Sequence, residues 1–127
     1  MPHLRIEYSG NLEAAGAMAT LCQALADTMA AQQDSEGNSV FPLAGTRVLA
    51  YPSAHHAVAG GGAGHGFIYL NLRITPGRPV AIVEAAGEAL LATIRAHFDA
   101  LRIDAKIGIT LHIDEGKPVY EGKHRLP

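Results

Sequence analysis

The sequence predicts an α/β (α+β) fold in which two β-α-β units form one four-stranded sheet with two helices on one face. Three observations predict this class. Short segments that alternate apolar and polar residues are typical of half-buried strands. Two longer segments with apolar residues at helical spacing separate them. The length of 127 residues fits one domain with a core large enough to fold. Residues 1–127 are therefore expected to form a single domain.

The first half of the chain carries the pattern strand, helix, strand. Residues 4–8 alternate apolar and polar side chains, which predicts a strand. Asn11 is a favourable N-cap residue, and apolar residues at helical spacing follow it over about five turns. These apolar positions are Leu12, Ala15, Met18, Leu21, Cys22, Leu25 and Met29. We expect this helix to end near residues 32–34, and a second strand to cover residues 46–51.

The second half repeats that order. Residues 67–74 give the clearest strand pattern in the chain. A turn then ends at Pro79, a residue favoured in the first turn of a helix, and helical spacing continues over residues 83–101. Residues 107–113 alternate again, which predicts the last strand. The polar tail from Glu115 to Pro127 is expected to form a turn or a short arm.

Both helices are long enough to connect parallel strands, so each half is expected to be a right-handed β-α-β unit. With both helices on one face, the other face of the sheet stays open. That face carries Tyr69, Asn71 and Arg73 together with small and apolar residues. Association of subunits would bury it, so we expect an oligomer.

Composition disfavours several classes of protein. The formal net charge of −2 shows no basic surplus, which disfavours nucleic acid as a partner. No signal peptide pattern is visible, and no segment reaches the roughly 18–20 apolar residues of a membrane span. The single cysteine, Cys22, lies on the apolar side of the first helix, where we expect it to pack in the core. It cannot form an internal disulfide, so we expect a cytoplasmic protein.

Three residues suggest proton-transfer chemistry. Removal of Met1 would leave Pro2 with a secondary α-amine, and such groups titrate at about 7.7–8.0 when unperturbed. That range suits a general base at neutral pH. Arg47 and Arg78 each offer a fixed fork of donors for a carboxylate, and nearby cations favour a neutral amine. Each arginine alone is more often solvated or ion-paired. Together these residues fit proton transfer on a small di- or tricarboxylate.

Histidines and one tyrosine are weaker candidates. His55, His56 and His65 flank a glycine-rich loop, but no cysteine or carboxylate stands at ligand spacing, so no metal site is predicted. We expect His112 to make an interface hydrogen bond. Tyr69 could donate a hydrogen bond to a substrate, and packing at a subunit interface is an equally good interpretation.

Three segments of the sequence resemble the 5-carboxymethyl-2-hydroxymuconate isomerase family of the tautomerase superfamily. They are Met-Pro-His-Leu-Arg-Ile-Glu-Tyr-Ser-Gly-Asn at the start, Phe-Pro-Leu-Ala-Gly-Thr-Arg over residues 41–47, and Phe-Ile-Tyr-Leu-Asn-Leu-Arg-Ile-Thr-Pro-Gly-Arg over residues 67–78. The resemblance covers nearly the whole chain. It implies a homotrimer of β-α-β-β-α-β subunits with sites near subunit boundaries, Pro2 as catalytic base, and Arg47 and Arg78 as binders of substrate carboxylates. The implied reaction is ketonisation of a dienol in homoprotocatechuate catabolism, without a cofactor.

Two alternatives remain open on the sequence. One keeps Pro2 and the fold but changes the reaction to decarboxylation or dehalogenation of an unsaturated acid. The other is a non-catalytic homologue that binds a small acid or a protein, which retention of Met1 would favour because an acylated Pro2 is no base. The tail residues Gly122-Lys123-His124 depart from the asparagine-rich ending of the family, which leaves the exact substrate open.

Overall fold

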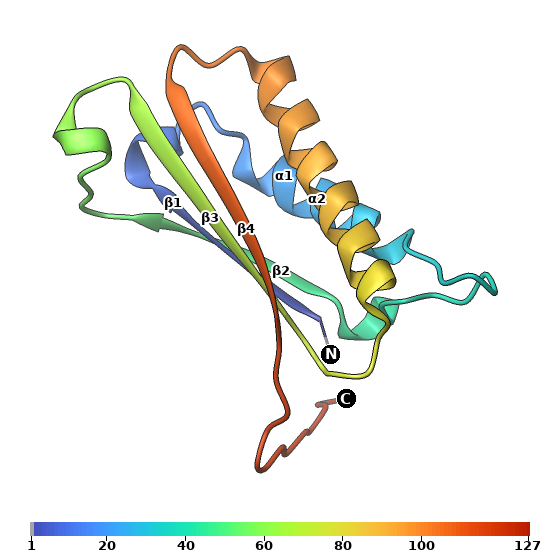
Figure 1. The fold of residues 1–127 in the computed structure, drawn as a ribbon. Helices are drawn as coiled ribbons and strands as arrows, with labels where there is room; N and C mark the ends of the chain where they lie inside the picture. The colour runs from blue at the N-terminus through green and yellow to red at the C-terminus, as the bar shows by residue number, and fades with distance from the viewer. Residues whose placement is uncertain (1) are drawn as a thin grey trace.

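A computed structural model describes residues 2–127 and confirms the predicted topology. The strands are β1 (His3–Ser9), β2 (Arg47–Ser53), β3 (His65–Ile74) and β4 (Lys106–Glu115), and the helices are α1 (Met18–Ala30) and α2 (Val80–Leu101). They form a four-stranded sheet in the order β2-β1-β3-β4. β1 pairs parallel with β2 and β3 parallel with β4, and the two central strands are antiparallel. Figure 1 shows both helices on the same face of the sheet, as predicted.

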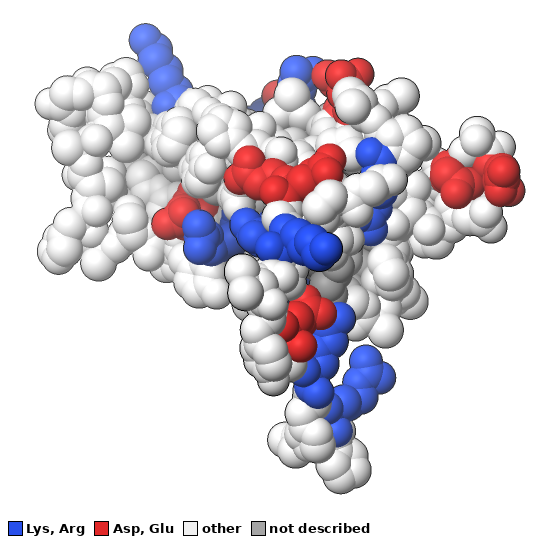
Figure 2. All heavy atoms as spheres, turned by 60° about the horizontal axis from the view of Figure 1, so that its bottom comes forward, with Lys and Arg blue, Asp and Glu red and all other residues white. Residues whose placement is uncertain are grey.

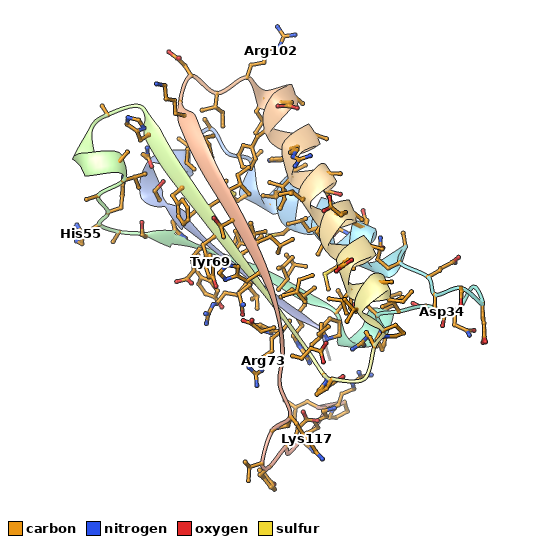
Figure 3. All side chains as sticks on the ribbon, viewed as in Figure 1. Asp34, His55, Tyr69, Arg73, Arg102 and Lys117 are labelled. Carbon is orange, nitrogen blue, oxygen red and sulfur yellow. The ribbon has the colours of Figure 1, made fainter. Side chains whose placement is uncertain are left out.

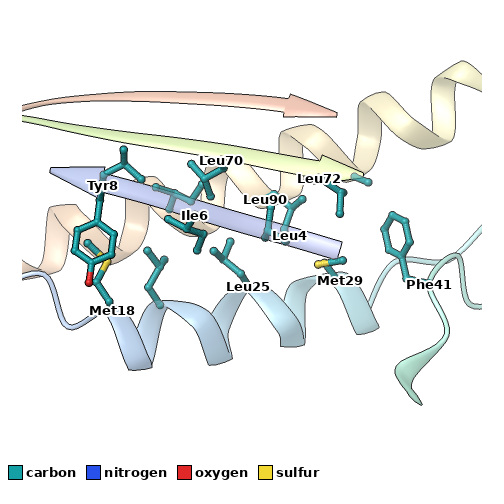
Figure 4. Packing of buried hydrophobic residues seen from close by; sticks show 14 of the residues in the cluster. Leu4, Ile6, Tyr8, Met18, Leu25, Met29, Phe41, Leu70, Leu72 and Leu90 are labelled. Carbon is teal, nitrogen blue, oxygen red and sulfur yellow. The ribbon is translucent and has the colours of Figure 1, made fainter. Parts of the chain in front are cut away.

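Alternation along the strands places the core between the sheet and the helices. The even-numbered residues of β1 and β3 point toward the helices, and the odd-numbered ones point to the open face. Figure 4 shows how side chains from the sheet meet those of α1 and α2. The fully buried members include Leu4, Ile6, Leu21, Leu25, Met29, Leu70, Leu72, Leu90 and Ile94. Each such side chain contributes about 1.5–3 kcal/mol, so this layer holds the helices on the sheet.

Cys22 packs against this core, as predicted. It is partly buried, and burial raises the pKa of its thiol. A raised pKa keeps the thiol protonated and unreactive near neutral pH. The residue therefore acts in packing.

The start of the first helix differs from the prediction. Asn11 does not cap it; its Nδ2 instead donates to the carbonyl of His65 at 2.8 Å. Residues 10–12 form a short 3-10 turn, and Ala17, with φ of 47°, precedes the helix in the left-handed region. The Leu12 side chain fills the space over Gly66, where an added Cβ would lie 2.8 Å from Leu12 Cδ2. Because Leu12 is anchored to the start of β3, the helix begins only at Met18.

The face of the sheet away from the helices is open in the described chain. Leu49, Tyr51 and Phe67 lie on it and are 38%, 48% and 38% exposed. Because these apolar side chains are exposed in one chain, we still expect association of subunits to bury this face. No helix among residues 2–127 has both the length and the apolar composition to cross a membrane.

The tail leaves the sheet as an extended arm, in line with the predicted turn or arm. Residues 116–127 have no regular secondary structure after β4 ends. Figure 1 shows the arm projecting from one end of the sheet and turning back toward the N-terminus. Its apolar side chains Val119, Tyr120 and Leu126 are exposed. The arm therefore contributes little to the core of its own subunit.

Candidate active site

Pro2 lies at the edge of the sheet immediately before β1 and is buried. Its carbonyl oxygen accepts a hydrogen bond from the backbone amide of Arg47 at 3.2 Å. Parallel strands start at the same edge of a sheet, so the parallel pairing of β1 and β2 brings these two residues together. The predicted base and the first predicted carboxylate binder are therefore neighbours, although they lie 45 positions apart in the sequence, by subtraction of 2 from 47. Removal of Met1 lies outside the described residues.

Cationic side chains follow the first row of the open face beside Pro2. His3 pairs with Arg47 on one side and with Arg73 on the other. Side chains opposite each other on one face lie close together, so the two arginines flank His3. Arg47 Nη1 lies 3.5 Å from the carbonyl oxygen of Gly45. The guanidinium of Arg73 lies against Gly116, where an added Cβ would make Arg73 move.

Arg73 was not predicted as a site residue, because the sequence showed only that it faces away from the core. Its position beside Pro2 depends on the antiparallel register of β1 and β3. Figure 3 shows Arg73 at the end of the sheet from which the arm continues to Lys117. Arg73 could have been identified as a site residue if the order of the strands in the sheet had been known.

A groove opens beside Arg47. Its volume is about 670 Å³. Its lining residues are Pro42, Ala44, Gly45, Arg47, Gly122, Lys123, His124 and Arg125. One wall is thus the segment before β2, and the other is the arm. Figure 2 shows Lys and Arg side chains gathered at the end of the molecule where the arm projects. The groove is suited to an anionic ligand.

Arg78 is committed to other contacts. Nε and Nη2 donate to the Val40 carbonyl at 3.4 and 3.2 Å, and Nη1 donates to the Thr75 carbonyl at 3.1 Å. Its guanidinium carbon also lies 5.2 Å from the ring centre of Phe41, which is buried. Arg78 does not line the groove beside Arg47. Within one chain, the structure does not bring the two predicted carboxylate binders into one cavity.

Tyr69 lies farther along the sheet. It pairs with Glu7, five positions beyond Pro2 by subtraction, which corresponds to roughly 16 Å along a strand. Its hydroxyl lies 3.0 Å from His112 Nδ1, and the two rings make an edge-to-face contact. Figure 3 shows Tyr69 on the middle of the sheet, away from Arg73. His112, which was expected to make a hydrogen bond at an interface, contacts Tyr69 of its own chain instead. Tyr69 and Pro2 of one chain are too far apart to share a small substrate.

The model of the family "5-carboxymethyl-2-hydroxymuconate isomerase" matches residues 2–125. The 5-carboxymethyl-2-hydroxymuconate Delta-isomerase of Escherichia coli is 28% identical over 123 residues, which cover 97% of this chain and 93% of that protein. A crystal structure of a 5-carboxymethyl-2-hydroxymuconate delta-isomerase has a TM-score of 0.92 and 46% identity, covering 98% of this chain and 89% of the other.

A further crystal structure, of a 5-carboxymethyl-2-hydroxymuconate isomerase from Deinococcus radiodurans R1, has a TM-score of 0.82 and 28% identity. It covers 98% of this chain and 90% of the other. Family model, sequence relative and solved structures thus agree along almost the entire length. The chain belongs to the 5-carboxymethyl-2-hydroxymuconate isomerase family of enzymes, as the sequence resemblance indicated.

Proposed function

We propose that this protein is a cofactor-independent keto–enol tautomerase that isomerises 5-carboxymethyl-2-hydroxymuconate during homoprotocatechuate catabolism in the cytoplasm. The observation that carries the proposal is the contact between Pro2 and Arg47 beside a cationic groove. It combines the one potential α-amine base with a carboxylate-binding arginine. Membership in the isomerase family supports this reaction over decarboxylation, dehalogenation or binding alone.

The reaction needs one proton to leave an oxygen and one to reach a carbon. The secondary amine of Pro2, free after loss of Met1, takes the proton of the 2-hydroxyl group. The electron pair of that O–H bond forms the carbonyl, and the conjugated double bonds shift toward the distal carbon. The protonated amine of Pro2 then gives the same proton to the distal carbon, so atoms and charge balance without an added reagent. Arg47 binds a carboxylate and stabilises negative charge that develops on the oxygen.

Arg78 and Tyr69 need a broader setting than one chain. Arg78 donates hydrogen bonds to the carbonyls of Val40 and Thr75. Only the N–H groups of its guanidinium that these carbonyls do not use are available for the proposed binding of a substrate carboxylate. Tyr69 lies too far from Pro2 of its own chain. We therefore place it at the site of a neighbouring subunit in a homotrimer. The exposed apolar side chains of the open face support such an assembly.

The test is the change in ultraviolet absorbance as 5-carboxymethyl-2-hydroxymuconate ketonises, with protein whose N-terminus has been checked by intact mass. General base catalysis typically contributes 10²–10⁴-fold, so protein that retains Met1, in which the Pro2 nitrogen is an amide, should have a kcat lower by about 100-fold or more. Arg47→Gln should raise KM. Arg95→Gln, which changes an exposed arginine on α2, is the matched charge control and should keep wild-type rates. Absence of turnover by protein with a free Pro2 would refute the proposed substrate.

A further inference from the structure

The wall of the groove opposite Arg47 consists of four consecutive residues of the arm, Gly122 to Arg125. Their side chains, together with Arg47, include three that stay positively charged at neutral pH, and no carboxylate lines the groove. The remaining lining residues are small or apolar, apart from His124. A ligand bound beside Arg47 therefore meets positively charged side chains on both sides of the groove, from Arg47 and from the arm.

The two arm cations differ in what they contact. Lys123 Nζ lies 2.8 Å from Glu121 Oε1, and the hydrogen bond with Lys123 lowers the pKa of the Glu121 carboxyl. Lys123 is thus already paired with a carboxylate of the arm. Arg125 makes no hydrogen bond or ion pair with any residue in the part of the chain that the structure describes. All donors of its guanidinium are thus open to a ligand.

The number of carboxylates on the proposed substrate decides how many cationic partners it needs. Muconate is a dicarboxylate, and the carboxymethyl substituent adds a third carboxylate. Arg47 serves the reacting end next to Pro2, and Arg78 donates to Val40 and Thr75 outside the groove. The third carboxylate accordingly needs another partner, and a planar guanidinium can bind it through two parallel hydrogen bonds.

We propose that Arg125 binds the carboxylate of the carboxymethyl group, so that the C-terminal arm selects tricarboxylate over dicarboxylate substrates. The inference rests on the proposed function and deepens it. Arg125 lines the same groove as Arg47 and is exposed to its interior from the arm.

The experiment compares two substrates that differ only in the carboxymethyl group, 5-carboxymethyl-2-hydroxymuconate and 2-hydroxymuconate. Arg125→Gln should lower kcat/KM for the tricarboxylate by about tenfold, mainly through KM, the size expected for one charged contact. It should change kcat/KM for 2-hydroxymuconate by less than about twofold, because that substrate has no group for Arg125. Arg125→Lys should restore part of the loss. Lys117→Gln removes the same charge from the same arm outside the groove and is the matched control.

A loss of equal size on both substrates would show a general charge effect and would overturn the proposal, as would no loss on either. Calorimetry with propane-1,2,3-tricarboxylate and glutarate supplies a binding readout that needs no turnover. Arg125→Gln should weaken the tricarboxylate about tenfold and leave glutarate unchanged. If wild-type protein with a free Pro2 binds both acids but turns over neither substrate, the proposed reaction fails while the role of Arg125 is still decided by these affinities.

Discussion

Replacing Arg78 by alanine tests whether this arginine stabilises the fold. The substitution removes donors to the Val40 and Thr75 carbonyls and the stacking of the guanidinium on Phe41. A net hydrogen bond contributes about 1 kcal/mol, so the two carbonyl acceptors together account for about 2 kcal/mol. The cation–π contact adds about 0.5–1 kcal/mol at a partly exposed position. Water can reach the freed carbonyls, so we expect a net loss of about 2 kcal/mol.

For a domain of this size, 1 kcal/mol corresponds to a shift in Tm of about 4 °C, so Arg78→Ala should lower Tm by about 8 °C. Thermal unfolding by circular dichroism at equal protein concentrations measures it, because association also shifts Tm. Arg95→Ala removes an exposed arginine with no such contacts and should stay within about 2 °C of wild type. Equal Tm values for the two variants would refute the reasoning, and would return Arg78 to the role of a free carboxylate binder.

Three further predictions concern packing and ionisation. Burial, followed by the hydrogen bond to Glu13, raises the pKa of Tyr8 from 10.0 to about 12. The phenol therefore ionises at lower pH in the unfolded chain than in the folded one, and the free energy of unfolding should fall as pH rises from about 10 to 12. Urea titrations measure this fall, which should be smaller in Tyr8→Phe. Leu25→Ala should cost about 2–5 kcal/mol by denaturant unfolding, whereas the 77% exposed Leu43 should tolerate alanine; similar midpoints would contradict the core assignment. Gly66→Ala should cost about 1–3 kcal/mol by crowding Leu12, and an unchanged midpoint would show that this contact is loose.

Periodicity was sufficient to predict the topology because burial alternates along most of β1 and β3, the two central strands. In β3 every even-numbered residue from Gly66 to Ile74 is buried, so a period of two is unmistakable in the sequence. The apolar stripe of α2 likewise appears at Ala86, Leu90 and Ile94. Two long helices between strands then leave parallel pairing within each half as the natural connection. Hydrophobic pattern and chain length together carry this information.

The start of α1 could not be predicted in the same way. Leu12 fits the apolar stripe of a helix, and Asn11 fits an N-cap, but both serve β3 instead. Gly16 also offers its carbonyl oxygen to His97 Nε2 at 2.8 Å, a contact with α2 that no local pattern shows. Tertiary contacts at Gly66 and His97 therefore override the helical pattern of residues 12–17.

The candidate site was predictable only in part, because its members come from strand starts and from the arm. Pro2 and Arg47 could be named from residue chemistry and from the family motif, and parallel pairing then placed them together. Arg125 gave no signal, since a basic residue in a polar tail normally means a solvated surface. Its place in the groove depends on how far the arm turns back after β4, which no repeat in the sequence shows.

The sheet register also decides which residues one chain can contribute to a site. His3, Arg47 and Arg73 share the first row of the open face, directly after Pro2, whereas Tyr69 and His112 lie on later rows and bond to each other. A small carboxylate bound at Pro2 can reach the first row and the arm, but not Tyr69 of the same chain, because strand residues rise by about 3.3 Å each. One chain therefore offers a base and cations at one end of the sheet and an aromatic pair at its middle. An assembly that joins these two regions must align the end of one sheet with the middle of another.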